Sequence, residues 1–146
     1  AVPPPTQPPG TSGPTLEPFD GAAPGTAVAT GSGVDGTYAI PASDLDCYFD
    51  FDQGAWTIQT VGGVDPIFYL YAFAAEAGGT TDRVSMGLVV GDGSNGRLLL
   101  FDTSVSPPDG AAQAQVSVAG GQVTVVVQGR ATNGATLAAN LTCAGS

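Results

Sequence analysis

Glycine, asparagine, aspartate and proline recur from residue 37 onward at intervals of about ten residues, as turn signals do between short strands. The segments between them are rich in valine, threonine and aromatic residues, and several alternate apolar with polar positions. They cover residues 44–52, 55–61, 67–75, 83–90, 97–102, 114–119, 122–130 and 136–143. The pattern predicts an all-β domain over residues 37–146, an antiparallel β-sandwich or barrel of about eight or nine strands.

The segment at residues 67–75 is the most aromatic part of the chain. As a strand it places Tyr69, Tyr71 and Phe73 on one face and Phe68 on the other, and water cannot cover both faces. Trp56 adds a ring from the preceding predicted strand. Two interpretations remain open for these five candidate binding residues: a core between facing sheets, or an apolar groove for a lipid, a glycan or a protein partner.

The chain has two cysteines, Cys47 and Cys143. An even number in an acidic, lysine-free chain favours a disulfide formed in an oxidising, extracytoplasmic setting, whereas the alternative is a pair of buried free thiols. The bridge would close a loop of roughly 95 residues, which the loop-closure model values at about 4–5 kcal/mol.

The first 36 residues differ in composition from the rest of the chain, because they hold most of its prolines and few large apolar side chains. We expect this Pro/Gly-rich arm to favour polyproline II at its start and to act as a semi-rigid linker. It is either a spacer that holds the domain away from a surface or a docking arm anchored by Leu16 and Phe19.

Four aspartates, Asp44, Asp46, Asp50 and Asp52, share one face of the first predicted strand. Carboxylates at alternate positions lie about 7 Å apart. Hard oxygen ligands of this kind suit calcium, so these residues are a candidate metal site, although a straight strand spreads them and a solvated face is the simpler interpretation. A pair of acids flanking a cleft would be needed for glycoside hydrolysis, and the spacing gives no sign of one.

The charge composition excludes several function classes. The chain has a formal net charge of -10, three arginines, no lysine and no histidine. Nucleic-acid binding requires cations that displace phosphate counterions, and imidazole-based catalysis and most zinc, copper and haem sites require histidine. We therefore expect no catalytic residues, no cofactor other than calcium, and no nucleic-acid partner.

The cysteine placement and several short motifs carry a family resemblance. The motifs are Asp46-Cys47 before the Gly54 turn, Trp56-Thr57-Ile58, Arg83-Val84, Gly96-Arg97-Leu98, Val123 to Gly129, and Ala138 to Cys143. In these features the chain resembles the mycobacterial lipoprotein antigen family (LpqH-like), small secreted β domains behind a low-complexity tether. The resemblance implies an actinobacterial cell-envelope protein without enzymatic activity, such as an adhesin, an antigen or an accessory binding protein.

One feature departs from that family, whose members carry a lipid on an N-terminal cysteine. This chain begins at Ala1, which fits a mature secreted form cut at a small-residue site, or a shortened chain. We therefore expect a secreted or surface-displayed protein that works by binding an envelope component, a lipid, a glycan or a protein. The alternatives are a structural subunit that self-assembles through residues 1–36 and a carboxylate-dependent glycan-active enzyme.

Overall fold

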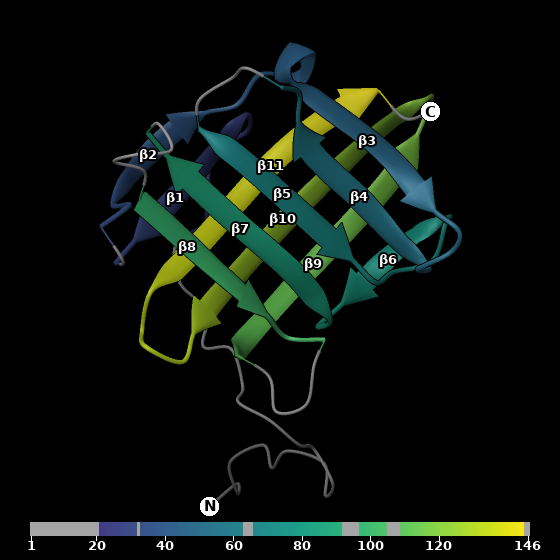
Figure 1. Cartoon of the computed structure of the whole chain (residues 1–146). Coiled ribbons are helices and arrows are strands. Elements are labelled where there is room, and N and C mark those ends of the chain that lie inside the picture. Colours follow the sequence, from purple (N-terminus) through teal and green to yellow (C-terminus); the bar gives the residue numbers. More distant parts are fainter. Residues whose placement is uncertain (1–20, 32, 63–65, 92–96, 105–108, 145–146) are drawn as a thin grey trace, which may run out of the picture.

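The computed structural model describes residues 21–31, 33–62, 66–91, 97–104 and 109–144. Within these ranges eleven strands form two antiparallel sheets that pack face to face, and the strands of one sheet run across those of the other (Figure 1). The predicted all-β fold, with two antiparallel sheets in a sandwich-like arrangement, is confirmed. Residues 1–20, including Leu16 and Phe19, lie outside the described residues, so the docking role of the arm stays a prediction.

The six-stranded sheet, called sheet A here, has long central strands and short outer ones. In spatial order its strands are β2 (Gly36–Ala39), β1 (Thr26–Thr30), β11 (Thr136–Ala144), β10 (Gln122–Ala131), β9 (Gly110–Ala119) and β6 (Gly78–Thr81). The hairpin between β9 and β10 turns at Gly120 and Gly121, whose φ values of 59° and 78° are left-handed. The tight hairpin predicted there from the Gly-Gly pair is confirmed because both residues adopt the backbone that such a turn requires.

The five-stranded sheet, called sheet B, is built mainly from consecutive hairpins. In spatial order its strands are β3 (Leu45–Asp50), β4 (Ala55–Thr60), β5 (Ile67–Ala72), β7 (Val84–Val90) and β8 (Arg97–Asp102). Before β3 stands one short 3-10 helix, η1 (Ala42–Asp44). The described part of the chain has no helix with the length and hydropathy needed to cross a membrane.

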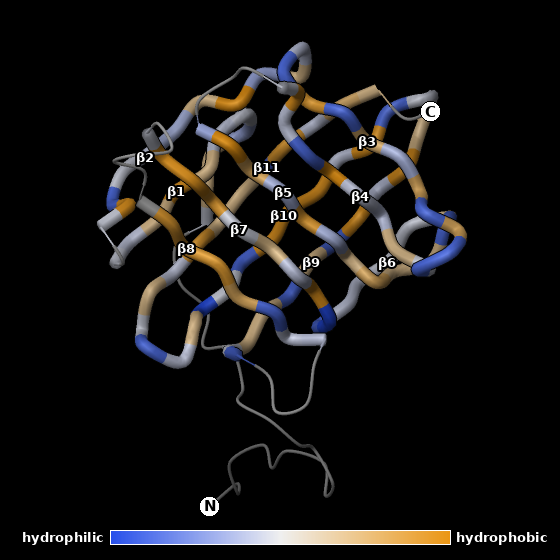
Figure 2. The backbone as a smooth tube through the Cα atoms, in the orientation of Figure 1, coloured by the Kyte–Doolittle hydropathy of each residue, from blue (hydrophilic) through white to orange (hydrophobic). Residues whose placement is uncertain are grey.

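The core lies between the two sheets and is filled from alternate positions of the strands. In Figure 2, hydrophobic and hydrophilic stretches alternate along the strands and hydrophilic residues gather at turns. The largest fully buried side chains in the strands are Ile58, Phe68, Leu70, Val84, Met86, Leu88, Val123, Val125, Val127, Leu137 and Leu141. Period-two alternation therefore sets which side of each strand faces the core.

The disulfide between Cys47 and Cys143 is present and joins the two sheets. Cys47 lies on β3 and Cys143 on β11, and their Cα atoms are 6.2 Å apart. Both cysteines are buried in the core. The bridge therefore connects the faces of the sandwich in addition to closing a long segment of chain.

The sandwich begins earlier than the sequence pattern indicates. Strand β1 pairs antiparallel with β11, and β2 pairs with β1, although residues up to 36 were expected to belong to the arm. Ala27 and Ala29 are almost fully buried in the core. The boundary at residue 36 is wrong because these small side chains pack closely between the sheets, where large apolar groups are unnecessary. Strand β6, with the sequence Gly-Gly-Thr-Thr, was likewise not predicted.

Candidate functional site

The outward side of β5 carries the side chains that the alternation pattern places together. Phe68, Leu70 and Ala72 are buried, whereas Ile67 is 49% exposed and Tyr69 and Tyr71 are half-buried. The predicted division of this strand into two faces is confirmed. The tyrosines therefore lie on the outer surface of sheet B, and Phe68 lies in the core.

Strand register extends this surface across β7 and β8. Ile67 pairs with Val89, which in turn pairs with Leu98, and Tyr69 and Leu100 pair with the same residue of β7, Gly87. Leu98 and Leu100 are 48% and 47% exposed. We call these outward side chains the apolar band, which consists of Ile67, Tyr69, Val89, Leu98 and Leu100.

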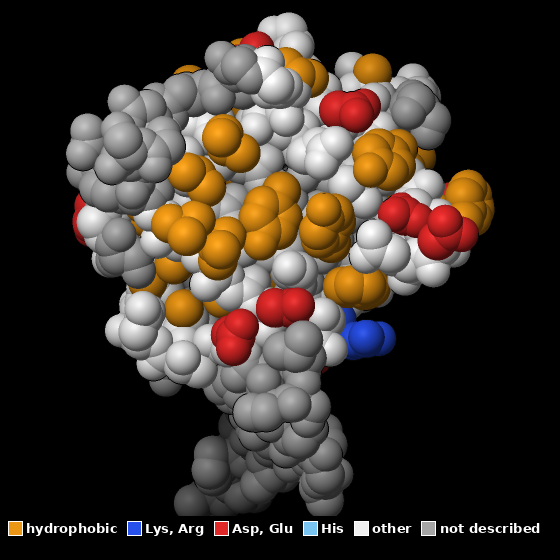
Figure 3. Space-filling model, in the orientation of Figure 1, with side chains coloured by type: hydrophobic (Ala, Val, Ile, Leu, Met, Phe, Trp, Pro, Cys, Tyr) orange, Lys and Arg blue, Asp and Glu red, His pale blue; other side chains and the backbone are white. Residues whose placement is uncertain are grey.

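Figure 3 shows hydrophobic side chains running across the face that sheet B presents, with acidic side chains beside them. Single exposed apolar residues are common on soluble proteins, but a contiguous set on one face is the usual mark of a contact surface. The sequence pattern did not single out Leu98 and Leu100, because three successive leucines show no alternation.

Gly87 makes the apolar band continuous between β5 and β8. A Cβ atom at this position would overlap Leu100 Cδ2 and lie 2.6 Å from Tyr69 Cε1. The Tyr69 and Leu100 side chains thus lean over the glycine from the two neighbouring strands. The missing side chain lets the two residues share one surface without a group between them.

Tyr69 belongs to the apolar band and also lies near polar side chains. Its ring centroid is 5.5 Å from that of Tyr71. Burial is the main cause that raises the pKa of Tyr69 above 10.0, and the charges of Tyr71 and Asp102 raise it further, while a hydrogen bond with Ser85 opposes the shift. The neutral phenol is therefore the favoured form of Tyr69 in the folded protein.

Thr57 is a buried polar residue on the same outer face. The register places it on β4 between Tyr48 of β3 and Tyr71 of β5, and only 1% of its surface is exposed. Its Oγ1 atom is buried and has no hydrogen-bond partner among the residues that the structure describes. An unsatisfied buried hydroxyl costs about 1–3 kcal/mol, so the burial of this hydroxyl is unfavourable for folding.

Two of the five candidate binding residues are core residues instead. Phe68 is fully buried, and Trp56 is 5% exposed, packs edge-on against Phe49 and donates its Nε1–H to the Ala75 carbonyl at 3.1 Å. Period-two alternation separates the faces of a strand but does not say which face meets the other sheet. Phe68 and Trp56 therefore stabilise the sandwich and present no ring to a partner.

Phe73 follows the end of β5 and is half-buried. The Arg83 guanidinium carbon lies 5.2 Å from the centroid of its ring, within the range of a cation–π contact. This ring is therefore partly covered by a side chain of its own protein, and it contributes less exposed surface than the apolar band.

The four aspartates do not form the calcium site considered from the sequence. Asp44 ends helix η1, Asp46 and Asp50 lie on β3, and Asp52 lies in the turn after it. The Asp50 carboxylate accepts hydrogen bonds from the backbone N–H groups of Asp52 and Gln53 and so caps this turn. Within the ranges that the structure describes, no three acidic, cysteine or histidine residues gather as metal ligands.

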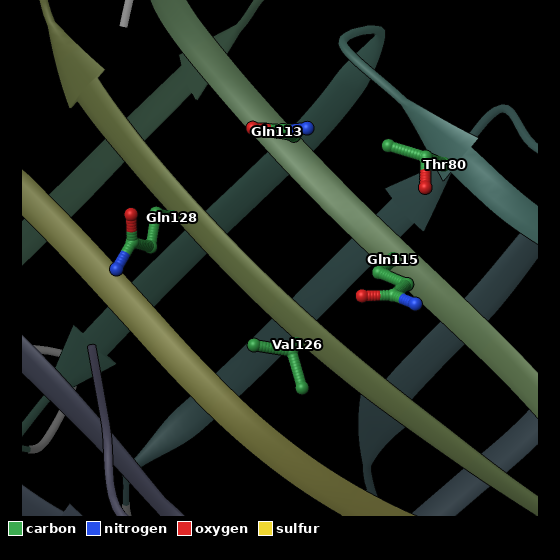
Figure 4. A pocket seen from close by; sticks show the side chains of 5 residues that line it. All are labelled: Thr80, Gln113, Gln115, Val126 and Gln128. Carbon is green, nitrogen blue, oxygen red and sulfur yellow. The ribbon is translucent and has the colours of Figure 1, made fainter. Parts of the chain in front are cut away.

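A second surface feature lies on the outer face of sheet A. An open hollow of about 210 Å³ is lined by Thr80 of β6, Gln113 and Gln115 of β9, and Val126 and Gln128 of β10 (Figure 4). Four of these five lining residues are polar and none is charged, in contrast to the apolar band on the opposite side of the molecule. The two outer faces of the sandwich therefore offer different chemistry.

No protein-family model, curated protein or solved structure matches this chain.

Proposed function

We propose that this chain is a secreted or cell-surface binding protein of an actinobacterial envelope, antigen-like and without enzymatic activity. Its contact surface is the apolar band on sheet B. The observation that carries the proposal is the grouping of Ile67, Leu98 and Leu100, each about half exposed, on one outer face. Burial of these side chains against a partner removes apolar surface from water, which contributes a favourable free energy of about 25 cal/mol per Å².

The extracellular location is supported by the disulfide and by the composition. A disulfide that joins Cys47 to Cys143 persists in an oxidising compartment and is rare in the cytosol. The family resemblance of the sequence motifs points in the same direction. A rigid disulfide-linked sandwich behind a proline-rich segment suits display of a binding surface at a distance from the cell.

The absence of enzymatic activity is supported by the side chains that the chain carries. It contains no histidine or lysine, which removes the commonest general bases and amine nucleophiles. Of the four aspartates near the start of sheet B, Asp50 uses its carboxylate to accept hydrogen bonds within the local turn. A scaffold that presents an apolar surface accounts for these features better than a carboxylate-dependent hydrolase.

The proposal is tested with isolated actinobacterial cell walls and, separately, with vesicles of extracted envelope lipid. We expect the full chain to sediment with one of these fractions and the Leu98→Ser/Leu100→Ser variant to lose at least about tenfold in affinity, equal to about 1.4 kcal/mol. The matched control is Val118→Ser/Val126→Ser, which removes two valines, each 41% exposed, from the other sheet. Equal binding by both variants, or no binding by the unmodified chain, contradicts the proposal.

A further inference from the structure

The described part of the chain begins at Gly21, which lies against the outer face of sheet A. The Gly25 N–H donates to the Asn140 carbonyl at 2.7 Å, and Asn140 Nδ2 donates to the Ala22 carbonyl at 3.5 Å. A Cβ atom at Gly21 would lie 3.1 Å from Gln128 Nε2. Asn140 belongs to β11 and Gln128 to β10. Toward its N-terminus, the chain therefore passes from β11 to β10 across this face.

Ala138 indicates that the outer face of sheet A is covered at this point. It lies on the outer side of β11, because both of its neighbours in sequence belong to the core. It is nevertheless only 1% exposed. The register places it opposite Gln128, and Asn140 is the next outward residue of its own strand. Gly21 and Ala22 thus approach the side chains that flank this buried alanine.

The hollow on sheet A lies directly beyond Gln128 in the same direction (Figure 4). Gln128 lines it on β10 and pairs with Gln113 on β9. In the next row, Val126 of β10 pairs with Gln115 of β9, which pairs with Thr80 of β6. A segment that continues across the sheet from β10 toward β6 would therefore cross the hollow.

The arm has the reach and the side chain to enter this hollow. Phe19 precedes Gly21 by two residues, which an extended chain spans in about 7 Å. Val126 is the one apolar residue among the described residues that line the hollow, and it lies about 7 Å from Gln128 along β10. A cavity of about 150 Å³ holds a benzene ring. An open hollow of about 210 Å³ therefore admits the ring of one phenylalanine.

Charge distinguishes the two outer faces of the sandwich. The six strands of sheet A contain no aspartate or glutamate, and their one charged residue is Arg130. The outer face of sheet B carries acidic side chains, among them Asp46 and Asp102. The arm has two acidic residues, Glu17 and Asp20, and no cationic side chain. Repulsion between like charges therefore disfavours sheet B as the surface that the arm covers, and favours sheet A.

We propose that residues 16–20 of this chain lie across the outer face of its own sheet A, with the Phe19 ring in the hollow against Val126. The lining supplies partners for an extended backbone, because glutamine amides both donate and accept hydrogen bonds. An extended segment around Pro18 makes no internal hydrogen bonds and needs such partners. Leu16 lies three residues before Phe19, so it reaches β6, which is about 10 Å from β10.

This contact goes beyond the proposed function, because it uses the face opposite to the apolar band. It divides the arm into a docked part, residues 16–20, and a proline-rich spacer, residues 1–15. The spacer then leaves from sheet A, and the apolar band on sheet B stays open to an envelope partner. The two proposals are separable, since a variant in the hollow should leave binding to the envelope fraction unchanged.

Nuclear magnetic resonance of the full chain tests the contact without any variant. We expect a nuclear Overhauser cross-peak between the Phe19 ring protons and the Val126 methyl groups. Backbone order parameters at Glu17, Phe19 and Asp20 are expected near the value of about 0.85 that is typical of rigid strands, and below about 0.6 near residue 10. The absence of this cross-peak overturns the proposal, as does a cross-peak from Phe19 to the leucines of β8.

Limited proteolysis with chymotrypsin measures how often the docked segment is released. Cleavage after Leu16 and Phe19 is expected to be at least about tenfold faster in Val126→Asp than in the unmodified chain, because cleavage follows the population of the released form. The matched control is Val118→Asp, since Val118 is also 41% exposed but lies on the inner side of β9. Equal rates for Val126→Asp and the unmodified chain, or equal acceleration by both variants, overturn the proposal.

Sedimentation equilibrium distinguishes the chain's own arm from the arm of a second copy. The full chain is expected to remain a monomer between about 10 µM and about 1 mM, a range that detects weak association. A dimer that Phe19→Ser dissociates would place each arm in the hollow of the other chain. That result would overturn docking within one chain.

Discussion

Cys47 on the edge strand β3 is bonded to Cys143 on β11, an interior strand of the opposite sheet. The register continues the connection, because Cys47 pairs with Ile58 on β4 and Cys143 pairs with Val123 on β10. All four residues are buried in the core. The bridge thus fixes the distance between the sheets where sheet B would otherwise end in a strand held on one side only.

Removing this bridge is expected to destabilise the protein strongly. The two cysteines are 96 residues apart, for which the loop-closure model gives about 4–5 kcal/mol of lost unfolding free energy. The change is Cys47→Ala/Cys143→Ala, measured by denaturant unfolding against the unmodified chain with and without reductant. Reduced wild type serves as the control and should match the variant. An unchanged unfolding midpoint after verified reduction contradicts this expectation.

The strands that sequence could predict are those whose alternation involves large side chains. Residues Leu45 to Asp50 and Ile67 to Ala72 form strands where the polar and apolar periods indicated them. Strands β1 and β6 were missed because alanine, threonine and glycine give little hydrophobic contrast. Their positions depend on pairing with distant partners, Thr26–Thr30 with β11 and Gly78–Thr81 with β9, and that information is not local.

The candidate surface was only partly predictable for a related reason. Alternation separated Tyr69 and Tyr71 from Phe68, but it could not say which group faces the second sheet. Leu98 and Leu100 are exposed because they lie on the face of β8 that points away from sheet A, and a run of three leucines does not show which of them point that way. The four aspartates do not share one strand face as expected, because β3 ends at Asp50. The chain turns there, and the Asp50 carboxylate accepts a hydrogen bond from the turn.

A glycine at the sheet interface should be intolerant of even a methyl group. A Cβ atom at Gly129 would overlap Phe101 Cζ and Met86 Cε, which reach it from the opposite sheet. Gly129→Ala is therefore expected to lower the unfolding free energy by about 1–3 kcal/mol through overpacking. Chemical denaturation measures the change, and Gly62→Ala is the control because, among the described residues other than its chain neighbours, no atom lies within 4 Å of a Cβ there. Equal stability of the two variants would contradict the close packing of Phe101 and Met86 against Gly129.

Thr57 should be replaceable with a gain in stability. Its buried hydroxyl has no hydrogen-bond partner in the described part of the chain, so Thr57→Val removes an unsatisfied polar atom while it keeps the branched shape. We expect the unfolding free energy to rise by about 1 kcal/mol, measured by thermal and denaturant unfolding. The matched control is Thr124→Val, which breaks the 3.1 Å hydrogen bond between the Thr124 and Thr142 hydroxyls and should lower stability. A loss of stability with Thr57→Val would show that its hydroxyl has a partner.

Tyr69 should make stability depend on alkaline pH. Burial raises its pKa above 10.0 in the folded protein, so the unfolded chain releases the phenolic proton first as pH rises. The stabilisation is complete below pH 10.0 and is lost as pH increases from that value through the raised folded pKa. Tyr69→Phe is therefore expected to reduce the fall in unfolding free energy between about pH 9 and about pH 12.

Unfolding curves across that range, together with phenolate absorbance, measure the effect directly. The control is Tyr48→Phe, which removes one phenol from the same outer face of sheet B and leaves Tyr69, Ser85 and Asp102 in place. The control should retain the part of the pH dependence that Tyr69→Phe removes. If both variants lose stability equally above pH 10.0, Tyr69 is as hydrated as an ordinary surface phenol. That result would contradict the close approach of the Tyr69 and Leu100 side chains over Gly87.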